Sequence, residues 1–131
     1  MKFLKTIIII LIATTLFFSC KKQAGPGGLA SIKGRVYGTD VTSSGTVRDS
    51  GYLGNQHVFI SVAGDKYFFD DIKSSYDGTF EFKFLRKGSY DVWTYSNCDT
   101  CLWKQKLVLI PNVEISGRKE TVDVGVVKII F

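Results

Sequence analysis

The stretch from Tyr76 to Tyr90 constrains the fold of this chain more than any other part of the sequence. In it, aromatic residues recur at every second position with charged residues between them: Phe80, Phe82 and Phe84. A period of two is typical of a strand with one buried face and one face in water. The alternation therefore predicts a half-buried β-strand rather than a helix.

Two glycine-containing turns bracket this strand and predict a β-hairpin. Asp77-Gly78 precedes the strand and Lys87-Gly88 follows it, and glycine allows a tight turn because it reaches positive φ without steric cost. Beyond the second turn, alternate positions again share one face: Tyr90, Val92 and Thr94. We expect four side chains of this hairpin to point into a core: Phe80, Phe82, Leu85 and Tyr90.

The rest of the chain carries further short strand patterns separated by turn residues. The patterns cover residues 31–37, 57–63, 66–71, 104–110 and 121–131, and the last places Val122, Val124 and Val126 on one face. Residues 38–56 are polar and glycine-rich and are predicted as a long loop, with a short strand at 46–48. About seven strands with turns every eight to twelve residues predict an all-β sandwich.

A longer motif surrounds the hairpin and resembles the carboxypeptidase regulatory-like family. The motif is Asp-Gly-x-Phe-x-Phe-x-x-Leu-x-x-Gly-x-Tyr-x-Val from Asp77 to Val92, preceded by Gly34-x-Val36 and by a valine-rich strand at 57–63. The resemblance implies a transthyretin-like, Greek-key β-sandwich that serves as a scaffold rather than a catalyst. The long connection at 38–56 and a later pair of cysteines depart from the family pattern.

The first nineteen residues have the order of a secretory signal peptide. Lys2 and Lys5 are followed by an apolar run at 6–18 and by Ser19-Cys20. The run is about thirteen residues, shorter than the roughly twenty that span a bilayer as a helix. The sequence resembles the lipobox of bacterial lipoproteins, relaxed at Phe17 and Phe18, and this resemblance implies lipidation of Cys20. An uncleaved anchor is the alternative.

These features divide the chain into a signal peptide at 1–19, a lipidated Cys20 with a flexible tether at 20–30, and one domain at 31–131. Removing Lys2 and Lys5 lowers the formal net charge from +5 to +3, with 15 basic residues against 12 acidic ones. The basic residues form no run with interleaved aromatics, so no nucleic-acid partner is expected. We expect a bacterial cell-envelope protein held at the outer membrane by lipid.

The cysteine pair Cys98-Asp99-Thr100-Cys101 is the sharpest chemical signal in the domain. With Cys20 assigned to lipid, two thiols remain in an oxidising compartment, so we expect a Cys98–Cys101 disulfide. A redox cysteine is typically found at a helix N-terminus, whereas this pair follows a predicted strand. Reduced thiols, redox activity and metal binding remain as alternatives.

Three aromatic residues flank the cysteines: Trp93, Tyr95 and Trp103. Trp93 and Tyr95 alternate with Tyr90 and Val92, so they lie on the outer face if Tyr90 lies in the core. Exposed aromatics stack on sugars or fill pockets of a partner, which makes the three a candidate ligand-binding patch. The alternative is that loops or neighbouring strands cover them.

No catalytic or metal-binding constellation is apparent. His57 is the only histidine, too few for a zinc site, and no cofactor is expected. We therefore predict a non-enzymatic protein-interaction or structural module that is bound to the membrane through lipid on Cys20 and has a protein partner in the envelope. The alternatives are glycan binding through Trp93, Tyr95 and Trp103, and a CxxC redox activity.

Overall fold

A computed structural model shows two β-sheets packed face to face, and it describes residues 23–131. The all-β sandwich predicted by the sequence is confirmed, with eight strands and one short 3-10 helix. The elements are β1 (Pro26–Val41), β2 (Val47–Tyr52), β3 (His57–Val62), β4 (Asp70–Lys73), β5 (Thr79–Leu85), β6 (Gly88–Asn97), η1 (Leu102–Lys104), β7 (Gln105–Ile115) and β8 (Thr121–Ile130).

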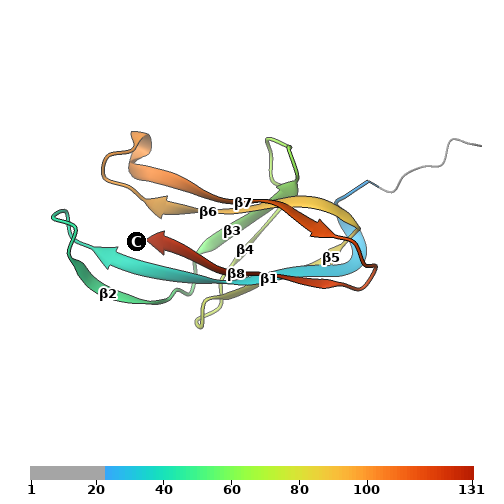
Figure 1. Ribbon diagram of the computed structural model, residues 1–131, viewed down its shortest axis with the longest axis horizontal. Helices are drawn as coiled ribbons and strands as arrows, with labels where there is room; N and C mark the ends of the chain where they lie inside the picture. The colour runs from blue at the N-terminus through green and yellow to red at the C-terminus, as the bar shows by residue number, and fades with distance from the viewer. Residues whose placement is uncertain (1–22) are drawn as a thin grey trace, which may run out of the picture.

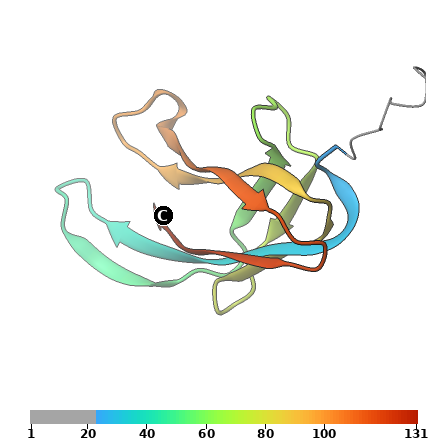
Figure 2. The same cartoon turned by 45° about the vertical axis from the view of Figure 1, so that its right-hand side comes forward.

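One sheet has the order β4-β3-β6-β7 and is antiparallel throughout. Its strands β6 and β7 form the upper part of Figures 1 and 2. The other sheet is built around β1, which pairs in parallel with β8 and antiparallel with β5 and β2. Because β1 is long, its first half contacts β5 while its second half contacts β2.

β1 begins earlier than the sequence predicts. Residues 20–30 are predicted as a flexible tether, but residues 26–30 are already part of β1, with Pro26 and Ala30 both opposite Leu85. Ala30 is buried, and any Cβ at Gly28 would overlap the carbonyl oxygen of Leu85. The glycines that suggest flexibility instead allow a close backbone approach, so the tether prediction is wrong for these residues.

The predicted loop at 38–56 is also wrong, because most of it is a β-hairpin. β1 continues to Val41 and turns through the Thr42 N–H, which donates to the Thr46 carbonyl at 2.8 Å. β2 then runs back along β1, with Tyr52 opposite Tyr37. Most β2 side chains are exposed, so the sequence lacks the apolar alternation that marks a half-buried strand.

The core lies between the sheets and contains the side chains expected from the central hairpin. Phe80, Phe82, Leu85 and Tyr90 are all buried, as predicted. Phe84, which shares their sequence period, is 67 % exposed and has φ 60°. The left-handed residue bulges the strand, and Leu85 takes the inward position that alternation assigns to Phe84.

A second bulge, in β8, reverses which of its side chains point into the core. Gly125 has φ 76°, and the β1–β8 register shifts between Lys33 and Arg35. Beyond the bulge Val127 and Ile129 are buried, whereas Val126 is exposed. The predicted alignment of Val126 with Val122 and Val124 is therefore wrong, because the extra residue reverses the alternation.

The Tyr90 side chain ties three parts of the chain together. Its hydroxyl lies 2.7 Å from the Arg86 carbonyl and 3.1 Å from the Gly25 carbonyl, and it accepts the Gly25 N–H at 2.8 Å. The same corner arrangement, with a tyrosine bonded to backbone a few residues upstream, recurs in other β-sandwiches. Burial raises the pKa of the Tyr90 phenol above its ordinary value.

Replacing Tyr90 with Phe leaves the Gly25 N–H and the Arg86 carbonyl without this partner. We expect Tyr90→Phe to lower the free energy of unfolding by about 1–3 kcal/mol, measured by urea denaturation. Tyr37→Phe is the matched control, because the Tyr37 hydroxyl donates to Ser50 Oγ at an exposed position; its cost should stay below about 0.5 kcal/mol. Equal costs would contradict a structural role for the Tyr90 hydroxyl.

The Glu120 carboxylate closes the turn between β7 and β8. It accepts the N–H groups of Gly117 at 2.6 Å and Ser116 at 2.8 Å, and these bonds hold its pKa below the ordinary 4.5. The unfolded chain therefore binds this proton more readily, so the stabilisation is present above pH 4.5 and lost as the pH falls below it. Urea midpoints at pH 7 and pH 3 should differ less for Glu120→Gln than for the native protein.

Candidate functional site

The outer face of the upper sheet carries a cluster of aromatic side chains centred on Phe59. Val58 and Ile60 of β3 point into the core, so Phe59 points outward. Its ring stacks on Trp93 at 6.0 Å and 18° and meets Tyr95 edge-on at 5.9 Å. Phe68, from the loop before β4, lies 5.0 Å from Phe59. Offset and edge-on aromatic pairs of this kind are favourable.

β7 extends this cluster with aliphatic side chains. Leu109 pairs in register with Trp93, and Leu107 pairs with Tyr95. The two leucines are 45 % and 48 % exposed. We use the term outer apolar face for the six side chains together: Phe59, Phe68, Trp93, Tyr95, Leu107 and Leu109. Phe59 and Trp93 are half-buried, and the other four side chains are exposed. An apolar surface of this kind is typical of an interaction site.

The structure brings together two of the three aromatics predicted as a ligand-binding patch. Trp93 and Tyr95 both lie on the outer apolar face and both contact Phe59. Trp103 lies in η1, at the loop between β6 and β7, and is 87 % exposed. Among the residues that the structure describes, no aromatic pair includes Trp103, so it forms a separate feature.

The patch predicted from sequence omits four side chains of this face: Phe59, Phe68, Leu107 and Leu109. Phe59 sits between two inward residues, so its outward position followed from the alternation, but its pairing with Trp93 depends on the β3–β6 register. Residues 107–110 are apolar at every position. Such a run indicates a strand with two apolar faces, and this was the available signal for a patch on the outside.

A polar recess lies at one corner of the outer apolar face. Its volume is about 460 Å³, and it is lined by Asn55, Gln56, His57, Phe59, Phe68, Asp71, Tyr95 and Gln105. The Gln56 amide donates to Thr94 Oγ1 at 2.9 Å, and His57 Nδ1 lies 3.0 Å from Asp71 Oδ2. The recess thus combines aromatic walls with amide, imidazole and carboxylate groups that can form hydrogen bonds.

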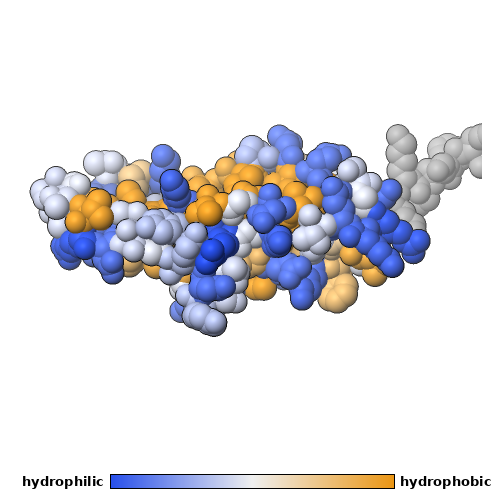
Figure 3. Space-filling model, turned by 60° about the horizontal axis from the view of Figure 1, so that its bottom comes forward, coloured by the Kyte–Doolittle hydropathy of each residue, from blue (hydrophilic) through white to orange (hydrophobic). Residues whose placement is uncertain are grey.

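The opposite face, on the β1 sheet, has mixed charge. Figure 3 shows hydrophilic side chains distributed over this side with hydrophobic ones between them. Lys33 pairs with Asp123 at 3.8 Å, and Lys83 with Glu81 at 3.6 Å. The Arg35 guanidinium lies 3.5 Å from the centre of the Tyr52 ring. Since charges of both signs alternate, this face offers no basic stripe for nucleic acid.

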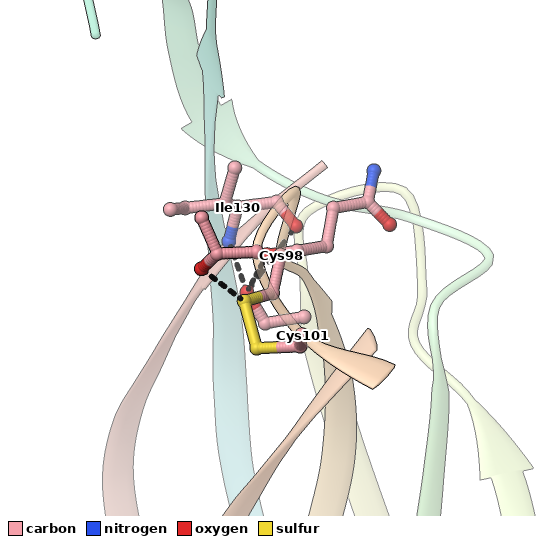
Figure 4. The surroundings of a disulfide bond; sticks show 6 residues. Cys98, Cys101 and Ile130 are labelled. Atoms are coloured by element: carbon pink, nitrogen blue, oxygen red, sulfur yellow. Dashed lines mark hydrogen bonds between the residues drawn. A yellow bond between two sulfur atoms is a disulfide. The ribbon is translucent and has the colours of Figure 1, made fainter. Parts of the chain in front are cut away.

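Cys98 and Cys101 form the disulfide that the sequence predicts (Figure 4). Their Cα atoms are 5.4 Å apart, and the bond closes the loop between β6 and β7. Three backbone bonds also stabilise the loop, from Cys98 N–H to Lys104, from Cys101 N–H to Cys98 and from Lys104 N–H to Cys101. The pair therefore rigidifies the loop.

The part of the chain that the structure describes contains no cluster of three His, Cys, Asp or Glu side chains placed to hold a metal ion. Within residues 23–131, no helix is both long and apolar enough to cross a membrane. The segment predicted as a signal peptide, residues 1–19, and Cys20 lie outside the described residues. Their roles remain predictions from sequence.

The chain can be compared with known protein families, curated proteins and solved structures. No family model and no curated protein matches the chain. Among solved structures, it resembles a protein from Pseudomonas aeruginosa described as a "putative carbohydrate binding protein", with a TM-score of 0.43 and 16 % sequence identity. The match covers 82 % of this chain and 92 % of that one. We infer no ligand from this likeness.

The small disulfide ring should contribute little to the stability of the whole domain. Loop-closure entropy for a four-residue ring is about 2 kcal/mol or less, so the Cys98→Ser, Cys101→Ser variant should unfold in urea at a slightly lower midpoint. Native protein treated with a thiol label under non-reducing conditions should take up no label at either position. Stoichiometric labelling of both would contradict the disulfide.

Proposed function

We propose that this chain is a lipid-anchored cell-envelope protein whose β-sandwich is a non-catalytic module that binds a protein partner through the outer apolar face. The observation that carries the proposal is the register of β3, β6 and β7. It aligns Phe59, Trp93 and Leu109 in one row across three strands. A row of this kind is costly to leave in water, at about 25 cal/mol per Å² of apolar surface.

The composition of the face favours a protein over other ligands. Trp and Tyr are the side chains that dominate the energetics of protein interfaces, and Leu107 and Leu109 add aliphatic surface beyond what ring stacking requires. Docking on the face is also favoured over addition of a strand at β7. The free edge of β7 is interrupted by Pro111 and by Asn112 at φ 55°, and both features disfavour strand pairing.

The membrane tether rests on the signal-like segment and on Cys20. From Cys20 to Pro26, where β1 begins, the chain spans six residues and reaches at most about 20 Å. A lipid on Cys20 would therefore hold the sandwich close to the bilayer. The partner that fits this arrangement is another protein at the envelope membrane, the outer membrane by our sequence prediction. The resemblance to carboxypeptidase regulatory-like domains is consistent with such a scaffold.

The polar recess favours glycan binding as the second candidate function. Sugar rings stack on aromatic side chains while their hydroxyls bond to amides and carboxylates. Tyr95 and Phe59 supply the rings, and Gln56 and Asp71 supply polar groups on the same recess. This candidate uses Tyr95 from the predicted patch, whereas Trp93 and Trp103 do not line the recess.

The test is crosslinking in cells followed by reconstitution. A photoreactive residue replacing Leu109 should crosslink to one protein, whereas the same residue replacing Asp123, exposed on the other sheet, should not. With the purified partner, Leu109→Glu should weaken binding by about tenfold or more, since it places a charge in an apolar interface. Equal crosslinking from both positions would overturn the proposal.

If the recess binds a glycan, the same two regions should respond differently to substitution. Tyr95→Ala should abolish retardation of the protein in polysaccharide-containing gels, because the stacking ring is lost. Leu109→Glu should leave that retardation unchanged, because Leu109 does not line the recess. Retardation that depends on Tyr95 alone would favour the second candidate over the first.

A further inference from the structure

The loop between β6 and β7 presents two large apolar side chains to water. We use the term cystine tip for residues 98–104, which contain the disulfide and η1. Leu102 is 81 % exposed and Trp103 is 87 % exposed. Neither belongs to the outer apolar face, and the partner docking proposed above does not use them.

The backbone of the cystine tip adopts an unfavourable conformation. Trp103 and Lys104 have φ of 64° and 54°, so two consecutive non-glycine residues are left-handed. A left-handed conformation is unfavourable for a residue with a Cβ atom. Two backbone bonds of Lys104 hold it, one accepted from the Cys98 N–H and one donated to the Cys101 carbonyl. Backbone strain of this kind occurs most often at functional positions, and here it determines where Trp103 points.

The charges around the cystine tip are mainly positive. Lys104 follows Trp103 directly, and Lys106 and Lys128 line the recess beside the disulfide together with Asp99. Tryptophan, an aliphatic residue and flanking lysines form the combination that is enriched where proteins meet the bilayer surface. Lysines near an anionic bilayer are attracted to its surface.

We propose that the cystine tip inserts Leu102 and Trp103 into the headgroup region of an anionic lipid bilayer, with the lysines against the lipid phosphates. Three backbone bonds hold the shape of the tip, from the N–H groups of Cys98, Cys101 and Lys104. The tip can therefore present Leu102 and Trp103 to the headgroup region in the conformation that it has in the structure.

The tip lies far from the start of the described chain. In Figures 1 and 2, the loop between β6 and β7 is at one end of the long axis, and the first residues of β1 are at the other end. A lipid near the start of β1 and a bilayer contact at the cystine tip would act at opposite ends of the sandwich. Together they would hold its long axis along the membrane surface.

The experiment uses residues 20–131 with Cys20→Ser, so that no lipid is present. This segment contains every core side chain, from Ala30 to Ile129. A Trp93→Phe background leaves Trp103 as the only tryptophan. Phosphatidylcholine vesicles with phosphatidylglycerol should shift its fluorescence to shorter wavelength, and brominated lipids should quench it.

Two matched variants locate the contact. Trp103→Ala and Leu102→Ser, made in the Trp93-containing protein, should each weaken co-sedimentation with these vesicles by about tenfold, from the loss of one inserted side chain. Tyr67→Ala is the control, because Tyr67 is 83 % exposed on a different loop; it should leave co-sedimentation unchanged.

Several outcomes would overturn the inference. They are a Trp103 fluorescence that anionic vesicles do not change, co-sedimentation that Tyr67→Ala reduces as much as Trp103→Ala, and a spectral shift that depends on protein concentration without vesicles. The last would indicate that the tip contacts a second copy of the protein. None of these outcomes bears on the crosslink at Leu109, so the two proposals fail independently.

Discussion

The hydrogen bonds of the Tyr90 hydroxyl connect the two sheets at the corner between β5 and β6, and the rest of the structure depends on them. The hydroxyl is buried in the core and bonds to Gly25 at the start of the described chain and to Arg86 at the corner between β5 and β6. Through it, the residue directly before the central strand of one sheet is fixed to a strand of the other. Gly25 is buried, so its N–H would otherwise lie in the interior without this partner, which is more costly than exposing it.

The strands that alternate regularly could be predicted from sequence, and the two bulged strands could be predicted only in part. Phe80 and Phe82 share one period and are buried, as expected. At Phe84 and at Gly125, a left-handed residue inserts one position and reverses the face of everything beyond it. A glycine within a strand pattern, as at Gly125, is a local signal for a bulge. Phe84 carries no such signal, and its bulge depends on the register with the neighbouring strand.

The candidate site also depends on strand register, which the local sequence does not reveal. Alternation was enough to place Trp93 and Tyr95 opposite the core side, but only the pairing of β3 with β6 shows that Phe59 lies between them. Proximity in sequence grouped Trp103 with these residues, yet the left-handed backbone of η1 separates it from them. One predicted patch therefore becomes two surfaces, and each has its own chemistry and its own test.

The parallel pairing of β1 with β8 has a consequence for how the chain reaches this structure. Among the strands that the structure describes, the one at the centre of its sheet is the first in the sequence, and the partner that covers one of its edges is the last, about ninety residues later. Contacts so distant in sequence form slowly. A chain that emerges from its N-terminus therefore exposes an unsatisfied edge of β1 until residues 121–130 have emerged, and this sheet cannot close before then.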